Sequence, residues 1–182
     1  MKLFEPIKIG NVELKNRVIM APMENGMAEV GTGEVTDRII AFFEERAQHN
    51  IAMIMPGSIG VSPEGRGLPT QLSLFDEKQV AGHKRLVDAI HNKGSLVAAQ
   101  LYHAGRQASE AITGLDPLAP SAIPCGILQN HPKEITHEQM DRIKEQFRQA
   151  ARWSIEAGYD IVEVHFAHGY LLHSFMSTHT NH

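Results

Sequence analysis

Apolar residues recur along the chain in two alternating patterns. Four short runs are rich in apolar and β-branched residues, at positions 18–21, 51–55, 96–99 and 161–164. Runs of this length, bounded by glycine, proline or charged residues, are typical of strands buried in a parallel sheet. Between the runs, apolar residues recur at three- and four-residue spacing, which predicts amphipathic helices.

The predicted helices have recognisable starts. Threonine and aspartate are good N-cap residues because their side-chain oxygens accept from the first free backbone N–H groups. Three of the predicted helices start at or near such residues: Thr36, Asp76 and Thr136. The second helix is expected to end at Gly94 and the third at Gly158, since glycine favours the conformation that closes a helix. Residues 171–175 are expected to start a fourth helix.

The order of these elements predicts a fold. Two short alternating runs, at 7–9 and 12–14, flank Gly10-Asn11 and predict an N-terminal β-hairpin. After it, strand, loop and helix follow one another four times, which predicts a parallel α/β sheet. The loops after the strands are longer and richer in glycine and proline than those before them. That asymmetry is typical of a (β/α) barrel, with a doubly wound sheet as the alternative.

The number of strands limits the barrel. A complete (β/α)8 TIM barrel needs about 250 residues, whereas this chain has 182. We therefore expect an α/β fold that is the N-terminal half of such a barrel: about four parallel strands with outer helices, as a single domain over 1–182. Four strands in an arc leave two open edges. Either the chain is a fragment, or its edges are covered by a second copy or by a complementary half-barrel.

Composition narrows the class of partner. The chain is 42% hydrophobic and 21% charged with a formal net charge of -4, which does not favour nucleic acid or an anionic membrane as a partner. Cys125 is the only cysteine, so no disulfide forms within the chain. No apolar run approaches the roughly 20 residues of a membrane helix. A cytoplasmic location is the expectation.

The stretch 160–170, D-I-V-E-V-H-F-A-H-G-Y, concentrates the candidate chemistry. It places His165, His168 and Tyr170 just after a strand, and the carboxyl ends of parallel strands are where ligands bind. Two imidazoles can donate to one oxygen and stabilise negative charge on it, or can ligate a metal. They can also be ordinary surface histidines, and the spacing alone leaves all three open.

Six segments of the chain together resemble one family. They are L-F-E-P-I-K-I-G (3–10), L-K-N-R-V-I-M-A-P-M (14–23), P-E-G-R (63–66), Q-L-Y-H-A-G-R (100–106), A-P-S-A-I-P (119–124) and H-F-A-H-G-Y-L-L (165–172). In this order they are similar to the N-terminal half of old yellow enzyme-type NADH:flavin oxidoreductases. The subgroup they most resemble includes the 2,4-dienoyl-CoA, enoate and bile-acid-type reductases.

The resemblance implies an FMN-dependent ene-reductase. Such enzymes take hydride from NAD(P)H and pass it to the activated C=C bond of an enone or enoyl substrate. The positions matching Ala21, Pro22, Met23, Ser58 and Gln100 would contact the flavin. By the same resemblance, a second set serves the substrate: His165 and His168 would bind its carbonyl oxygen or an anionic phenol, Tyr170 would donate a proton, and Tyr102 would line the pocket.

The resemblance also implies what this chain does not carry. In relatives the FMN phosphate is held by loops after the seventh and eighth strands, so we expect this chain alone to bind flavin weakly or not at all. An iron–sulfur cluster is not encoded here, and no metal is expected. Glu24 stands where relatives often have Cys, Thr or Gly near the flavin, and we expect its carboxylate to point to solvent. An inactive or partner-dependent half-barrel and, less favoured, a metal-dependent barrel hydrolase are the alternatives.

Overall fold

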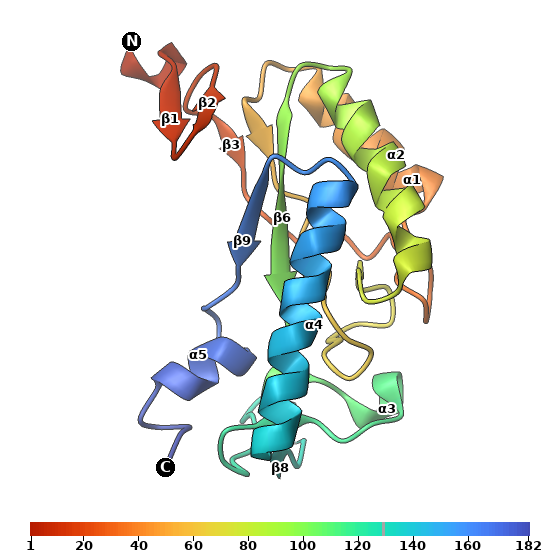
Figure 1. Cartoon of the computed structure of the whole chain (residues 1–182), viewed down its shortest axis with the longest axis vertical. Helices are drawn as coiled ribbons and strands as arrows, with labels where there is room; N and C mark the ends of the chain where they lie inside the picture. The colour runs from red at the N-terminus through yellow and green to blue at the C-terminus, as the bar shows by residue number, and fades with distance from the viewer. Residues whose placement is uncertain (129) are drawn as a thin grey trace.

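The computed structural model describes residues 1–128 and 130–182. A short 3-10 turn η1 (Lys2–Phe4) precedes the hairpin strands β1 (Ile7–Ile9) and β2 (Val12–Leu14). The main strands are β3 (Ile19–Met20), β4 (Met53–Ile54), β5 (Ile59–Gly60), β6 (Leu96–Tyr102) and β9 (Ile161–Val164). The helices are α1 (Asp37–Ala47), α2 (Val80–His91), α3 (Glu110–Thr113), α4 (His137–Glu156) and α5 (Leu171–Met176). Figure 1 shows their arrangement.

The main sheet is parallel, as the strand–helix alternation predicts. β3 pairs with β4, β4 with the start of β6, and β6 with β9. β5 pairs with the end of β6, so β4 and β5 lie one after the other along β6. Met53 is opposite Leu96 and Ile59 is opposite Leu101, which means that the β4–β5 segment carries one residue more than β6 over this interval. Residues 55–58, between the two strands, lie outside the ladder.

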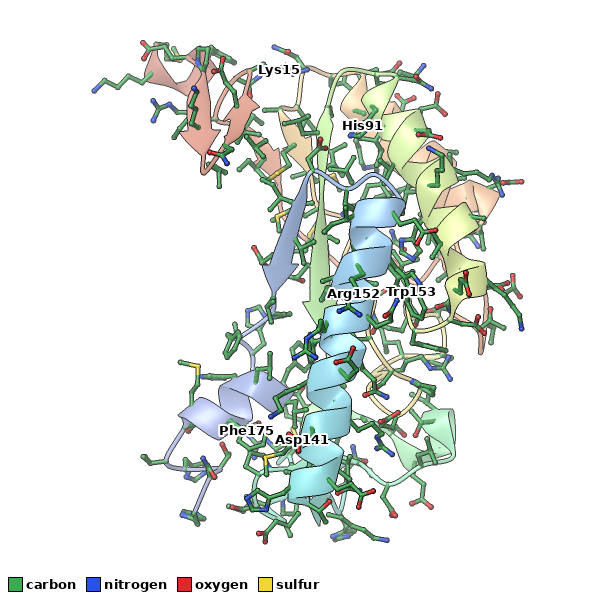
Figure 2. All side chains as sticks on the ribbon, viewed as in Figure 1. Lys15, His91, Asp141, Arg152, Trp153 and Phe175 are labelled. Carbon is green, nitrogen blue, oxygen red and sulfur yellow. The ribbon has the colours of Figure 1, made fainter. Side chains whose placement is uncertain are left out.

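The outer face of the sheet is covered by helices. α1, α2 and α4 lie on one side of the strands (Figure 1). Ile54, Val97 and Leu101 point to that side and are fully buried with Phe43 and Leu86 in the main apolar core. Trp153 lies on the α2 side of α4 (Figure 2) and packs against the same core. This face follows from the amphipathic spacing of the helices.

The inner face changes character along the strands. Ala98 and Ile161 pair near the amino-terminal end and pack with Leu14 of the hairpin in a small apolar cluster. Gln100 pairs with Glu163 one step further. Because side chains alternate along a strand, the next residues on this face are Tyr102 and His165. The inner face therefore runs from apolar, under the hairpin, to polar at the carboxyl ends.

The helix starts agree with the sequence. The hydroxyl of Thr36 accepts from the backbone N–H of Ile39 at 3.3 Å. Thr136 and Gln139 form a reciprocal capping box at the start of α4. Asp76 caps the 3-10 turn η2 (Glu77–Gln79), which continues into α2.

Several short elements were not predicted. The loop after β4 contains β5, and the segment after β6 contains the turn η3 (Gly105–Gln107), α3, and a two-stranded parallel ladder of β7 (Leu118–Ala119) with β8 (Lys133–Glu134). Each is too short to show a period in the sequence. The sheet, its four-step order and the hairpin are those of a half barrel, which confirms the expected fold.

Candidate active site

The two histidines lie side by side at the carboxyl end of β9. Nε2 of His165 is 3.3 Å from Nδ1 of His168, and the ring centroids are 5.0 Å apart at nearly a right angle. The backbone N–H of Ala167 donates to Nδ1 of His165 at 3.2 Å. Nδ1 is therefore unprotonated, and the proton of His165 is on Nε2, the nitrogen that faces His168.

The turn that carries His168 is held in an uncommon conformation. His168 has φ of 60°, in the left-handed region that non-glycine residues rarely adopt, and Gly169 follows with φ of 74°. The side-chain amide of Gln107 donates to the backbone oxygen of His168 at 2.7 Å. A Cβ at position 169 would come within 3.0 Å of that amide nitrogen. Gln107 and the absence of a side chain at Gly169 together fix the position of the His168 ring.

Tyr170 and Tyr102 complete this aromatic group. The Tyr170 ring meets the His165 ring edge-on at 5.1 Å and the Tyr102 ring at 4.9 Å. Tyr102 is almost fully buried, and its hydroxyl donates to Oε1 of Gln71 at 2.7 Å while accepting from the backbone N–H of Gly67 at 2.9 Å. Tyr102 thus forms a rigid wall beside Tyr170. Burial raises the pKa of both phenols, so both are protonated at neutral pH.

Burial also keeps His165 neutral. Its pKa is lowered, first by burial and then by the neighbouring His168, while Glu163 acts in the opposite direction. A neutral His165 with its proton on Nε2 is a hydrogen-bond donor. That N–H faces Nδ1 of His168 at 3.3 Å, so a ligand oxygen that contacts both nitrogens would lie beside the pair. If His168 also carries its proton on the facing nitrogen, both rings donate to the same point.

A second group of predicted residues lies on the neighbouring strands. A Cβ on Gly57 would come within 2.6 Å of Cβ of Pro22 and 3.3 Å of Oε1 of Gln100, so these three residues meet closely. Gln100 is buried and its amide donates to Oε1 of Glu163 at 2.6 Å. Glu163 thus has a hydrogen-bond partner on the neighbouring strand. Since Glu163 precedes His165 on the same face, the two groups are adjacent along the inner face.

The remaining predicted residues lie at the rim. Ala21 and Met23 are exposed, Met23 by 63%. Ser58 is half-buried; its hydroxyl accepts from the amide of Gln71 at 3.3 Å, and its backbone oxygen accepts from the same nitrogen. Ser58 therefore joins the tyrosine wall through Gln71.

The expectation for Glu24 is wrong. Its carboxylate does not point to solvent: it accepts from the amide of Gln71 at 2.6 Å and from the backbone N–H of Gly26 at 3.3 Å. It lines a pocket of about 220 Å³ together with Ser58, Tyr102 and Tyr170. The pattern of the sequence could not show this, because the glutamine that holds Glu24 is 47 residues away in a glycine- and proline-rich loop.

Gln71 and Gln107 are the residues that sequence reasoning missed. Gln71 contacts Ser58, Glu24 and Tyr102 and so joins three loops. Each contact spans a long sequence separation, and an isolated glutamine in a loop carries no periodic signal. The same loop approaches Tyr102 closely, since a Cβ at Gly67 would come within 2.8 Å of the Tyr102 hydroxyl.

The structure offers little for the metal hypothesis. Within residues 1–128 and 130–182, no group of three or more His, Cys, Asp or Glu side chains is arranged to hold a metal ion. His165 and His168 supply two nitrogens, fewer than the three protein ligands of most catalytic zinc sites. In the same described residues, no helix is long and apolar enough to span a membrane.

Comparison with known proteins decides the family. The sequence model of the NADH:flavin oxidoreductase / NADH oxidase family matches residues 2–182. The chain belongs to this family. It is 39% identical over 181 residues to the NADH oxidase of Thermoanaerobacter brockii, covering 98% of this chain and 28% of that protein. It is 37% identical to the NADPH dehydrogenase of Bacillus velezensis, covering 100% of this chain and 53% of that protein.

Solved structures give the same result for the fold. Morphinone reductase superposes with a TM-score of 0.90 at 31% identity, covering 98% of this chain and 51% of that chain. The old yellow enzyme from Pichia sp. AKU4542 gives 0.90 at 32% identity, and covers 99% of this chain and 50% of the other. A 2-naphthoyl-CoA reductase gives 0.95 at 30% identity with 99% and 29% covered. The chain therefore spans about a quarter to a half of the length of these relatives.

Proposed function

We propose that this chain is the substrate-activating half of a flavin-dependent ene-reductase. The reaction is hydride transfer from NAD(P)H, by way of FMN, to the activated C=C bond of an α,β-unsaturated carbonyl compound. The observation that carries the proposal is the pair of facing ring nitrogens of His165 and His168, 3.3 Å apart and beside Tyr170. A cytoplasmic location, where NAD(P)H is available, fits this reaction.

The histidine pair suits a substrate whose carbonyl oxygen gains negative charge. Hydride addition to the β-carbon of an enone turns the carbonyl oxygen into an enolate. An oxygen placed within hydrogen-bond distance of both ring nitrogens accepts two N–H bonds once His168 carries its proton on Nδ1. His168 is exposed, so water can exchange its proton between the two nitrogens. Donors that strengthen in the transition state are worth roughly 3–4 kcal/mol each, by analogy with oxyanion holes.

Tyr170 is placed to supply the second hydrogen. The enolate needs a proton at its α-carbon, and a phenol held beside the oxygen-binding pair can give it. Tyr170 is half-buried between His165 and Tyr102, and its raised pKa keeps the proton on the phenol at neutral pH. In this proposal His165 and His168 hold charge on the oxygen while Tyr170 delivers the proton.

The residues present fit a flavin. Gly57 lets Pro22 and Gln100 stand close together, because a Cβ at position 57 would come within 2.6 Å of Cβ of Pro22 and 3.3 Å of Oε1 of Gln100. The buried carboxamide of Gln100 offers both a donor and an acceptor, which is what the imide-like edge of an isoalloxazine requires. Ala21, Pro22, Met23 and Ser58 would hold the ring along the rim. When bound, FMN supplies the hydride chemistry.

The alternative is a half-barrel that works only with a partner. Within the described residues β3 pairs only with β4, and β9 only with β6, so the sheet has two open edges. We propose that a further half-barrel, in the same or another polypeptide, pairs with both edges. Light scattering tests this: assembly into a dimer or larger species supports covered edges, and a stable monomer contradicts association by this chain alone.

The main experiment is direct. The purified chain is examined for flavin absorbance before and after addition of FMN, then for NAD(P)H consumption with 2-cyclohexen-1-one. The proposal is supported by flavin binding together with enone-dependent consumption, when His165→Ala keeps the flavin binding and loses the consumption. A chain that stays colourless after FMN addition, and that shows no turnover when joined to the second half of a relative, rules it out.

A further inference from the structure

A carboxyl group shares the pocket with the proposed proton donor. Glu24 and Tyr170 line the same cavity of about 220 Å³, with Ser58, Gln71 and Tyr102 as neighbours. The cavity is large enough for several water molecules. Gln71 connects two of its walls, since its Nε2 donates to Oε2 of Glu24 at 2.6 Å and its Oε1 accepts from the Tyr102 hydroxyl at 2.7 Å. Glu24 is thus held in place by neutral donors and faces the tyrosines.

The carboxyl is not part of an ion pair. Among the ion pairs of the residues that the structure describes, none involves Glu24, and its carboxylate accepts from the backbone N–H of Gly26 and the amide of Gln71. Burial raises its pKa to about 7, against the lowering effect of the hydrogen bonds from Gly26, Gln71 and Asn25. At neutral pH about half of the molecules therefore carry Glu24 as a carboxylic acid.

Among the ionisable groups around the pocket, Tyr170 is the one that can exchange a proton with Glu24. Burial raises the pKa of Tyr170, and the negative charge of Glu24 raises it further. Tyr102 has both hydroxyl hydrogen bonds occupied. Arg66 acts on Tyr102, but its guanidinium donates to the backbone oxygens of Gly31 and Pro63.

The remaining groups near Tyr170 have partners of their own. His165 and His168 face each other, and Glu163 accepts from Gln100. Glu24 is the group on the pocket wall that holds an exchangeable acidic proton.

We propose that Glu24 returns the proton that Tyr170 gives to the substrate. The inference rests on the proposed function, in which Tyr170 donates to the α-carbon and is left as a phenolate. The O–H bond of the Glu24 carboxyl breaks, and the proton passes, directly or through one pocket water, to form the O–H bond of Tyr170. Glu24 then takes a proton from solvent, and no electrons are exchanged in the step.

The transfer is downhill and avoids a stranded charge. A carboxylic acid with a pKa near 7 is a stronger acid than a phenol whose pKa is raised above its usual value. Without a nearby acid, the phenolate would stay charged in a half-buried pocket until a proton arrived from bulk water. A carboxyl group poised near the working pH is suited to repeated proton transfer.

The first arm of the test needs no cofactor. The chain has three tyrosines, and burial raises the pKa of Tyr102 and Tyr159 strongly, so Tyr170 is expected to ionise first. Ultraviolet absorbance of tyrosinate follows this step, and Tyr170→Phe identifies it. Glu24→Gln should lower the pKa of Tyr170 by about 0.5–1 unit. Glu29→Gln, an exposed glutamate of the same loop, should not change it, and an unchanged Tyr170 in Glu24→Gln overturns the proposal.

The second arm uses the flavin-loaded enzyme that turns over an enone. Wild-type turnover should fall as pH rises through about 7, because the acid form of Glu24 is lost. Glu24→Gln should be about 10- to 100-fold slower without that fall, Glu24→Asp should keep it, and acetate should partly restore Glu24→Ala. An active Glu24→Gln with the wild-type pH profile overturns this proposal alone. A wild-type enzyme that reduces no enone overturns the proposed function, and this inference with it.

Discussion

The two faces of the same strands differ in what they contribute. On the outer face, Ile54, Val97 and Leu101 are fully buried beneath the helices, so each adds to stability. On the inner face, Ala98 and Ile161 at one end give way to Gln100 and Glu163, and then to the tyrosine and histidines. The same strands are thus apolar on their outer face, while their inner face changes from apolar to polar toward the carboxyl ends. Stability and chemistry are separated by the alternation of side chains rather than by distance.

The largest expected effect comes from substitutions of two neighbouring residues of β6 that point to opposite faces of the sheet. Leu101→Ala removes a fully buried outer side chain and should lower the free energy of unfolding by about 2–5 kcal/mol. Gln100→Ala, one residue earlier, should cost about 1 kcal/mol but abolish flavin binding. Denaturant unfolding and FMN titration of both variants measure this. Equal losses of stability would contradict the separation of the two faces.

The second largest expected effect is a loss of folding stability at acid pH, caused by two buried histidines. His83 and His103 are fully buried, and burial lowers the pKa of each to about 4. In the unfolded chain both take up protons near pH 6.5, so unfolding becomes easier as pH falls from about 6.5 to 4. Each contributes at most about 3 kcal/mol over that window. Urea unfolding against pH should show the slope.

A matched pair of histidine variants isolates this effect. His83→Gln should flatten the pH slope of stability even where it lowers stability overall, because Tyr159 and Ser73 lose their buried histidine partner. His49→Gln, at an exposed position, should leave the slope as in the wild type. A slope that persists in His83→Gln and in the corresponding His103 variant would assign it to other groups.

Glu24→Gln should raise the stability of the folded chain, and mainly at high pH. A pKa of about 7 in the folded chain against 4.5 unfolded means that the carboxylate is disfavoured by folding. Its unfavourable contribution is absent below pH 4.5, grows as pH rises and is complete above about 7, where it amounts to at most about 3 kcal/mol. The variant should therefore gain stability on the alkaline side and little at pH 5. Thermal unfolding at the two pH values tests this, and an equal effect at both would contradict it.

The smallest effect concerns the helix starts. Thr136→Ala removes the hydroxyl that accepts from the backbone N–H of Gln139 at 3.2 Å and should cost about 1 kcal/mol. Ser109 stands at the start of α3 without a side-chain capping bond, so Ser109→Ala should cost much less. Comparable losses in the two variants, in denaturant unfolding, would show that the capping bond is not the cause.

The outer face could be predicted from the sequence because burial leaves a period. The helix spacing of Ile39 and Phe43, and the apolar runs at 51–55 and 96–99, reflect where the core lies. Because side chains alternate along a strand, Glu163 and His165 share one face of 161–165. Short elements such as β5 and β7, with two residues each, have no period to find.

The inner rim could be predicted only in part. The end of the strand at 161–164 marked His165, His168 and Tyr170 as candidates, the resemblance suggested the roles that we propose for them, and the structure brings the three side chains together. Glu24 was misjudged because exposure of a charged residue is the ordinary expectation, and a single distant amide, Gln71, reverses it. Contacts of this kind depend on which loops meet, and no local pattern records that.

The most direct test of the paired histidines uses 4-nitrophenol, whose ionisation is visible from its own colour. If both rings donate to one oxygen, binding favours the phenolate, and the apparent pKa of the bound phenol falls below its value in water. His165→Ala and His168→Ala should each reduce this shift, and the double variant should abolish it. A shift that is absent from the wild-type protein, or unchanged when both histidines are replaced, would contradict the account.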